Sequence, residues 1–126
     1  MSAVPYEYVV LRAVPRPERE EFVNVGVVVH CRAQEFLDVA WHVDHARLRA
    51  LAPGVDCAAV DSSMAFIEGV CAGDPRGGVA AQQPLSQRFG FVKAPRSTVV
   101  QPGPVHGGVT TDPAATLQHL LDVLVR

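Results

Sequence analysis

The strongest strand signal in this sequence is the run FVNVGVVVHC, residues 22–31. β-branched residues dominate the run, and its apolar side chains occupy successive positions instead of alternate ones. A strand of this kind is apolar on both faces, so it is expected in the middle of a sheet that is covered on both sides. Gly26 inside the run indicates a β-bulge or a close approach of another backbone.

The segments on either side predict two partner strands. Residues 6–14, YEYVVLRAV, hold β-branched and aromatic types without Gly or Pro, which is typical of a strand. Residues 35–41, EFLDVAW, alternate, so that Leu37 and Trp41 share one face. Only the polar residues 32–34 separate this strand from the valine-rich one, which predicts an antiparallel hairpin. The first three strands are therefore expected to form a meander.

After residue 43 the pattern changes from strand to helix. Asp44 is expected to cap a short helix over 45–52, and Asp56 a longer helix over 57–72. The longer helix carries one apolar stripe, formed by Val60, Met64, Ile67 and Cys71. Gly69 inside it costs about 1 kcal/mol of helix propensity relative to Ala, so this helix must depend on tertiary packing.

The C-terminal third mixes loop and strand signals before it ends in a helix. Residues 73–87 predict a loop, whereas 88–93 and 96–101 predict extended segments. The Gly- and Pro-rich segment 101–112 predicts an irregular loop that leads into a helix. That helix begins at Asp112-Pro113, a cap residue followed by Pro at the first helical position. Its apolar stripe consists of Leu117, Leu120, Leu121 and Leu124.

These elements predict the α+β class, with an antiparallel or mixed sheet led by a three-stranded meander and with helices packed mainly on one face. The length of 126 residues fits a single domain over 1–126, and 48% hydrophobic residues are enough to build a core. No segment reaches the length of a membrane span, and the N-terminus lacks a secretory signal. Three Cys residues without CxxC spacing predict buried free thiols in a reducing cytoplasm.

The charge composition argues against nucleic acid as a partner, because the net charge is −2 and no basic excess exists. The preference for Arg, with Lys93 as the single Lys, is explained by a composition biased toward high GC content. The sequence contains no Gly-rich phosphate-binding motif, so no cofactor is predicted. His42 and His45 have a spacing that a metal site on a helix would use, but they straddle a predicted helix start and lack a third ligand, so no metal site is predicted.

Five residues are candidates for ligand binding: Arg12, Arg88, Arg96, Gln101 and His106. Arg12 shares a strand face with apolar residues and is expected to need an acidic partner. Its candidate partners are Glu18, Glu20, Glu21 and Asp38. Arg88 and Arg96 flank a predicted extended segment and are placed to pair with an acidic ligand. Structural ion pairs and solvated side chains are the alternative for all three arginines.

Gln101 and His106 belong to the 101–112 segment, where exposed backbone N–H groups lead to a helix N-terminus. That arrangement suits an anion or a phosphate. The alternative is a rigid connector in which His106 bonds a backbone carbonyl.

Two further groups of residues are predicted to be structural. Glu18, Glu20 and Glu21 alternate with Arg16 and Arg19, which is typical of a solvated loop. His30 ends the valine-rich strand, where a satisfied residue at an edge is expected.

Three segments together resemble the DUF3037 family, a bacterial family of unknown function. They are YEY at 6–8, FVNVGVV at 22–28, and QPGPVH at 101–106 followed by Asp112-Pro113. The resemblance covers roughly residues 5–125. It implies a small, cytoplasmic, stand-alone protein. Because genes of this family often lie beside those of HipA-like kinases, it also implies a protein partner of that type. The resemblance draws attention to residues in or beside these segments: Arg12, Glu21, Asn24, Gly26, Gln101 and His106.

Three functions stay open at this point. The first is an interaction and regulatory module without enzymatic activity, with a HipA-like kinase as the suggested partner, because no catalytic constellation is recognisable. The second is a small-molecule, phosphate or nucleotide-binding domain that uses segment 101–112. The third is an enzyme with His106 as acid or base. Self-association is compatible with each of them.

Overall fold

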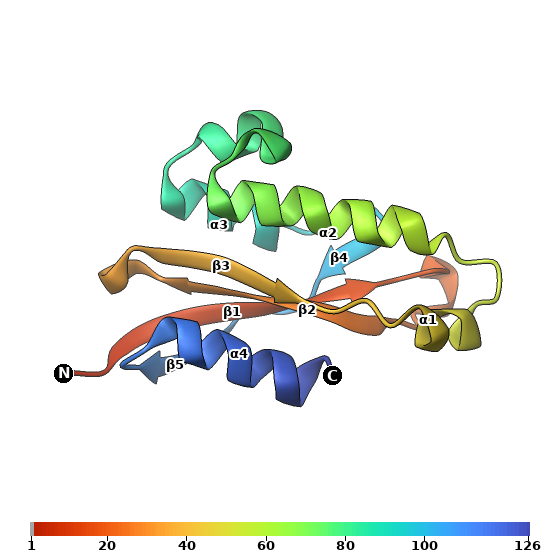
Figure 1. Ribbon diagram of the computed structural model, residues 1–126, viewed down its shortest axis with the longest axis horizontal. Coiled ribbons are helices and arrows are strands. Elements are labelled where there is room, and N and C mark those ends of the chain that lie inside the picture. Colours follow the sequence, from red (N-terminus) through yellow and green to blue (C-terminus); the bar gives the residue numbers. More distant parts are fainter. Residues whose placement is uncertain (1) are drawn as a thin grey trace.

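A computed structural model describes residues 2–126, and within them five strands form one antiparallel sheet that has helices on both faces (Figure 1). The strands are β1 (Val4–Ala13), β2 (Val23–Cys31), β3 (Phe36–Trp41), β4 (Val100–Pro102) and β5 (His106–Thr110). The α-helices are α1 (His45–Leu51), α2 (Cys57–Ala72), α3 (Leu85–Lys93) and α4 (Pro113–Leu124). Three short 3₁₀ helices complete the chain: η1 (Pro17–Arg19), η2 (Arg32–Gln34) and η3 (Pro75–Gln82). The predicted α+β class is confirmed.

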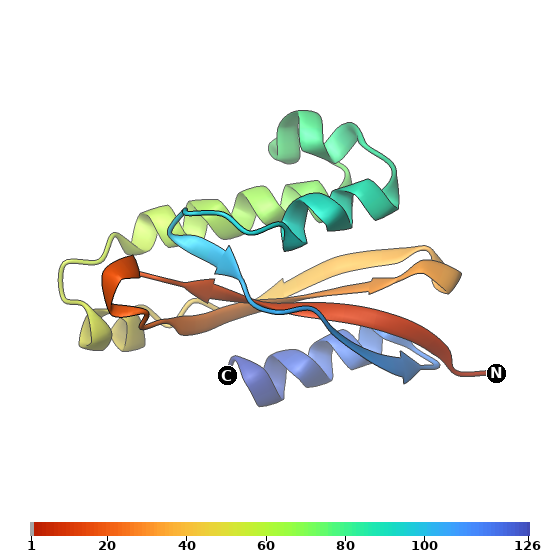
Figure 2. The same cartoon turned by 180° about the vertical axis from the view of Figure 1, so that it is seen from behind.

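The sheet has the strand order β3-β2-β1-β4, and β5 also pairs with β1. The predicted meander of the first three strands is therefore confirmed, with β2 between β1 and β3. Strand β4 pairs with residues 11–13 of β1, and β5 pairs with residues 4–8. The two short strands thus form one interrupted edge of the sheet (Figure 2).

The prediction of an irregular loop over 101–112 is consequently wrong for most of its length. The Pro and Gly residues of this segment are typical of a loop. Pro is nevertheless tolerated in an edge strand, because one side of such a strand forms no hydrogen bonds to another strand. Only residues 103–105 interrupt the pairing with β1, and Gly103 N still donates to Val10 O.

A β-bulge divides β2. Leu11 of β1 is opposite Gly26, whereas the next residue, Arg12, is opposite Asn24, so Val25 is the extra residue. A Cβ on Gly26 would lie 2.7 Å from Cε of Met64. The predicted bulge at Gly26 is confirmed, and the atom nearest to the Cβ position belongs to the Met64 side chain, with the backbone oxygen of Ala40 at 3.1 Å.

The two faces of the sheet are covered by different helices (Figure 1). Helices α2 and α3 pack against one face, where Val9, Leu11 and Val28 of the sheet are fully or almost fully buried, and Leu48 of α1, which lies beside the end of the sheet (Figure 1), joins the same core. Helix α4 alone covers the other face, where Leu117 and Leu121 pack against residues of β2 and β3. The alternating burial of the valines on both faces confirms the prediction that β2 is a central strand covered on both sides.

Three of the four α-helices of residues 2–126 lie where the sequence predicts them, and each has an Asp at its N-cap. Asp44 accepts a hydrogen bond from Arg47 N at 3.0 Å, Asp56 from Ala59 N at 3.0 Å, and Asp112 from Ala115 N at 3.1 Å. Each of these bonds satisfies one backbone N–H of a first helical turn. Among residues 2–126, no helix combines the length and the apolar character that crossing a bilayer requires.

The region 73–101 differs most from the prediction. Residues 88–93 belong to helix α3, not to a strand, because Phe89 and Val92, three positions apart, are both buried against the α2 side of the core. The predicted loop over 73–87 contains η3 and the start of α3, and of the predicted extended segment 96–101 only the last two residues belong to β4. The three cysteines are buried free thiols, as predicted.

Candidate functional site

The five predicted ligand-binding residues lie in different parts of the structure. Arg12 and Gln101 are opposite each other on β1 and β4 and line the same pocket. His106 is exposed on β5, with its ring 5.1 Å from the ring of Tyr8, its partner on β1. Within residues 2–126 its side chain makes no hydrogen bond, so the predicted bond to a backbone carbonyl is absent.

Arg88 and Arg96 are separate from that pair and from each other. Arg88 donates to the carbonyl of Cys71 at 2.7 Å and to that of Gln83 at 3.0 Å, so it ties the end of α2 to the start of α3. Arg96 lies over the ring of Phe91, 4.7 Å from its centroid, and burial lowers its pKa from the ordinary value. The structure therefore brings together only Arg12 and Gln101 of the five.

The expected acidic partner of Arg12 is absent. None of the ion pairs formed within residues 2–126 includes Arg12. Its guanidinium instead lies over the ring of Phe22, with Cζ 4.2 Å from the centroid. A stacked guanidinium keeps part of its hydration and gains cation–π energy, which explains why it is tolerated here without a carboxylate.

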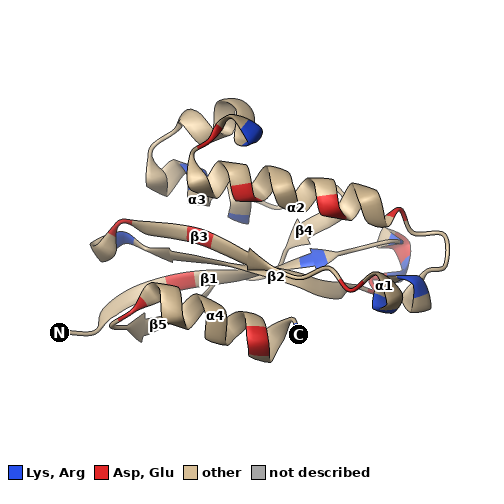
Figure 3. Cartoon of the chain, viewed as in Figure 1, with Lys and Arg blue, Asp and Glu red and all other residues tan. Residues whose placement is uncertain are grey.

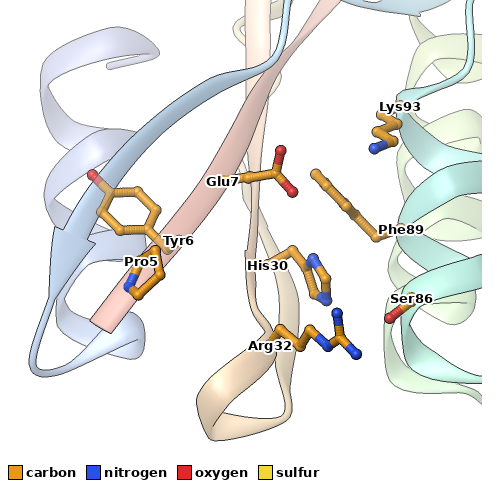
Figure 4. A pocket seen from close by; sticks show the side chains of 8 residues that line it. All are labelled: Pro5, Tyr6, Glu7, His30, Arg32, Ser86, Phe89 and Lys93. Atoms are coloured by element: carbon orange, nitrogen blue, oxygen red, sulfur yellow. The ribbon is translucent and has the colours of Figure 1, made fainter. Parts of the chain in front are cut away.

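The residues around His30 form a pocket of about 370 Å³ between the sheet and α3, which we call the His30 pocket (Figure 4). Strands β1 and β2, together with Arg32 at the start of η2, supply one wall, and α3 supplies the other. Its lining consists of Pro5, Tyr6, Glu7, His30, Arg32, Ser86, Phe89 and Lys93. Apolar walls with a few convergent polar groups are typical of small-molecule sites.

His30 is the most unusual residue of this pocket. Its side chain faces α3 beside that of Glu7, its partner on β1, and its ring lies 4.7 Å from the ring of Phe89. His30 is only 8% exposed, and its buried Nε2 has no hydrogen-bond partner within residues 2–126. The prediction of a satisfied residue at an edge is wrong, because β2 is central and the ring turns inward. An unsatisfied buried polar atom costs about 1–3 kcal/mol, so Nε2 requires a partner that the described chain does not supply.

The surroundings of His30 keep its imidazole neutral at neutral pH. Burial is the main cause that lowers its pKa from the ordinary value of 6.5. The carboxylate of Glu7 opposes this shift, whereas the positive charges of Lys93 and Arg32 add to it. A neutral imidazole has one donor and one acceptor nitrogen, so Nε2 can meet either kind of group in a ligand.

The two cations of the pocket are free of acidic partners. Neither Arg32 nor Lys93 takes part in any ion pair within residues 2–126. They lie on opposite sides of the pocket, with His30 and Phe89 between them (Figure 4), and Lys93 Nζ is 5.0 Å from the centroid of the Phe89 ring. With Glu7 as the single acid of the lining and His30 neutral, the pocket carries a net positive charge.

The start of α3 adds to this positive potential. Pro84 is its N-cap and offers no side-chain hydrogen bond, in contrast to the Asp caps of the other three α-helices. Ser86, which lines the pocket, lies in the first turn of α3, where backbone N–H groups lack helical partners. The combination of this helix end, two free cations and the orphaned Nε2 favours an anionic ligand.

Little in the sequence alone pointed to this pocket. Glu7 and His30 come together only through the register of β1 and β2, and Phe89 and Lys93 lie in the segment that was predicted to be extended. Within residues 2–126, no group of three or more His, Cys, Asp or Glu side chains is placed to hold a metal ion.

Comparison with known proteins gives one result. A family model described as "Protein of unknown function (DUF3037)" matches residues 8–125. No curated protein and no solved structure matches the chain.

Proposed function

The chain belongs to the DUF3037 family, to which no function is assigned, and we propose that it is a binding module for a small organic anion that enters the His30 pocket. The observation that carries this proposal is the orphaned Nε2 of His30, buried beside two cations that lack acidic partners. A ligand oxygen at Nε2 would satisfy the imidazole, and its negative charge would balance Arg32 and Lys93.

The lining also suggests the rest of the ligand. Pro5, Tyr6 and Phe89 offer an apolar surface next to the cations, so an anion with a flat apolar part fits better than inorganic phosphate or acetate. The carboxylate of Glu7 repels a second negative charge on its side of the pocket, which favours a ligand with a single anionic group.

Thermal shift and calorimetry with matched probes test this proposal. Benzoate and benzenesulfonate, which each carry one negative charge at neutral pH, are expected to stabilise the protein, whereas benzamide, which is neutral, is expected to have no effect. A ligand at about 100 times its dissociation constant adds roughly 2.7 kcal/mol to the free energy of unfolding, which is easily measured. Acetate and inorganic phosphate are expected to bind at least tenfold more weakly than the aromatic anions.

A variant with both cations removed locates the binding. The double change Arg32→Gln and Lys93→Gln is expected to weaken benzoate binding at least 30-fold. Arg49→Gln removes a positive charge from an exposed position on α1, outside the pocket, and is expected to leave binding unchanged. Equal affinity of the double variant and the wild type, or equal stabilisation by benzamide, contradicts the proposal.

The interaction module is the second candidate, and the edge formed by β4 and β5 supports it. The sequence has no charged residue between Arg96 and Asp112, and both strands are free of charge in Figure 3. Val105 is 44% exposed and Val109 is 70% exposed. Sheet edges usually carry charges that prevent pairing with another chain, so an uncharged edge with exposed valines suits a partner that adds a strand.

Co-purification from the source cell at several salt concentrations tests this second role. The HipA-like kinase suggested by the family resemblance is the first partner to look for. Val109→Lys is expected to lower the recovery of the partner at least tenfold, because a Lys on an edge strand opposes strand addition. Val123→Lys, at a position 58% exposed on α4, is the matched control. Recovery of free chain alone at every salt concentration contradicts this role.

A further inference from the structure

Three polar residues form a row on the sheet face that α4 covers. Asn24 on β2 is opposite Arg12 on β1, which in turn is opposite Gln101 on β4. Asn24 Nδ2 donates to the carbonyl of Leu124, near the end of α4, at 3.0 Å. The remaining oxygen of this amide, Asn24 Oδ1, and Arg12 Nε are both buried without a hydrogen-bond partner within residues 2–126. These two buried polar atoms, on paired residues of β2 and β1, are both unsatisfied by the described chain.

The guanidinium of Arg12 is held in a defined position. Its Cζ lies 4.2 Å from the centroid of the Phe22 ring. The backbone of Gly103 also lies against it, since a Cβ on Gly103 would be 3.0 Å from Arg12 Cζ and 3.1 Å from Nε. The contacts with Phe22 and Gly103 fix the orientation of the guanidinium without an acidic partner. The remaining N–H donors of the guanidinium are therefore available to a ligand.

Arg12 and Gln101 line a pocket of about 420 Å³, which we call the Arg12 pocket. Its lining consists of Arg12, Val14, Pro17, Glu20, Phe22, Gln101 and Pro102. Its volume lies in the range of small-molecule sites. Gln101 Nε2 donates to Thr98 O at 3.0 Å, so the side-chain oxygen of Gln101 stays free to accept a hydrogen bond.

Glu20 gives this pocket a second charge of opposite sign. Glu20 lines the same pocket as Arg12, yet the two side chains form no ion pair within residues 2–126. Glu20 also has a left-handed backbone, with φ of 56° and ψ of 24°, which costs about 1–2 kcal/mol in a residue other than Gly. This backbone conformation ends η1 and turns the chain at the pocket wall. A basic and an acidic residue therefore line one cavity without forming an ion pair.

We propose that the Arg12 pocket binds a small zwitterion with the chemistry of a free α-amino acid. Its carboxylate pairs with the guanidinium of Arg12, and its ammonium group pairs with the carboxylate of Glu20. The oxygen of Gln101 accepts a further hydrogen bond from the ammonium group. Val14, Pro17 and Pro102 supply an apolar wall for the side chain of the ligand.

Calorimetric titration with the twenty standard L-amino acids tests this proposal, followed by the N-acetyl and amide derivatives of the strongest binder. The N-acetyl derivative lacks the ammonium charge, and the amide lacks the carboxylate. Each derivative is expected to bind at least tenfold more weakly than the parent amino acid. No binding by any amino acid, or equal binding of the N-acetyl derivative, overturns the proposal.

Charge-removing variants assign the two ends of the ligand. Glu20→Gln and Arg12→Gln are each expected to weaken amino-acid binding at least tenfold. The controls are Glu18→Gln and Arg16→Gln, which remove charges from the same segment at positions outside the pocket lining. If Arg12→Gln fails to fold, Glu20→Gln decides alone, since its side chain is exposed. Unchanged binding by Glu20→Gln overturns the proposal, and so does loss of binding in the double variant of Arg32 and Lys93, which would assign the amino acid to the His30 pocket.

Discussion

Replacing Gly77 by Ala is expected to lower the free energy of unfolding by about 3 kcal/mol. A Cβ at Gly77 would lie 2.5 Å from the backbone nitrogen of Val70 and 2.7 Å from its Cα. These atoms belong to the backbone of α2, so no side-chain rotation can relieve the overlap, and η3 must move away from the helix. Overpacking usually costs about 1–3 kcal/mol, and a backbone overlap of this size belongs at the upper end.

Gly69→Ala tests the same contact from the side of α2. A Cβ there would lie 2.6 Å from Gly77 N and 2.6 Å from Arg76 Cβ. Helix propensity alone would favour Ala over Gly by about 1 kcal/mol, so the two effects have opposite signs. The steric overlap is expected to cost more than the gain in helix propensity, so the free energy of unfolding is expected to fall by about 2 kcal/mol.

Urea unfolding at equilibrium measures both changes, with Gly90→Ala as the matched control. Gly90 is also inside a helix, α3, but nothing lies within 4 Å of its Cβ position. The control is therefore expected to gain up to about 1 kcal/mol. A Gly69→Ala variant as stable as the wild type would mean that η3 is not held against α2 through this contact.

These glycines also show how far the sequence predicts the fold. The sequence places α2 correctly and indicates that Gly69 makes the helix depend on tertiary packing. It does not reveal what packs there, because η3 lies in a Gly- and Pro-rich segment that has no periodic apolar pattern. Local signals identify long elements, whereas the partner of a glycine is decided by contacts between segments.

The segment RFGFVK, residues 88–93, illustrates a second limit. Its aromatic and β-branched residues predict a strand, yet it forms the last six of the nine residues of α3. Phe89 and Val92 are buried while Phe91 is 39% exposed, and this spacing is that of one helix face. In a run of six residues the spacing of apolar side chains does not distinguish a helix from a strand. Burial of one side of the segment against β2 and α2 favours the helix instead.

The two candidate pockets differ in how much of them the sequence indicates. Arg12 was selected from its place on a strand face and Gln101 from the 101–112 segment, and the pairing of β1 with β4 brings them together. Glu20 was one of four acidic residues considered as partners of Arg12 and was also predicted to be part of a solvated loop, and nothing local selects it over the other three as the residue that lines the cavity. The His30 pocket depends on the register of β1 and β2 and on α3, part of which was predicted to be an extended segment. The sequence therefore did not indicate that the residues of this pocket lie together.

Phe89→Ala is expected to lower the free energy of unfolding by about 3–5 kcal/mol. Phe89 is 1% exposed and belongs to the largest fully buried side chains of the described residues. Removal of a buried Phe ring loses its transfer free energy and leaves a cavity. Phe89→Leu preserves most of the volume and is expected to lose about 1.5 kcal/mol or less, so it stays folded for the next measurement.

Loss of this ring is also expected to change how stability depends on pH. In the wild type, burial against Phe89 lowers the pKa of His30 below the value of 6.5 that it has in the unfolded chain. Protonation therefore favours the unfolded state, so this contribution to stability is complete above about pH 6.5 and is lost as the pH falls through the folded pKa. In Phe89→Leu water reaches the imidazole, its folded pKa rises toward 6.5, and less stability is lost in acid.

The deficit of Phe89→Leu relative to the wild type is thus expected to shrink between pH 7 and pH 5, in urea unfolding at both values. An NMR titration of the His30 ring should show the matching rise of its pKa. Phe91→Leu is the control, since Phe91 contacts Phe66 and Arg96 and does not touch His30. Equal pH slopes for Phe89→Leu and the wild type would mean that the ring of Phe89 does not shield His30, and the neutral imidazole on which the anion pocket depends would then lack its physical cause.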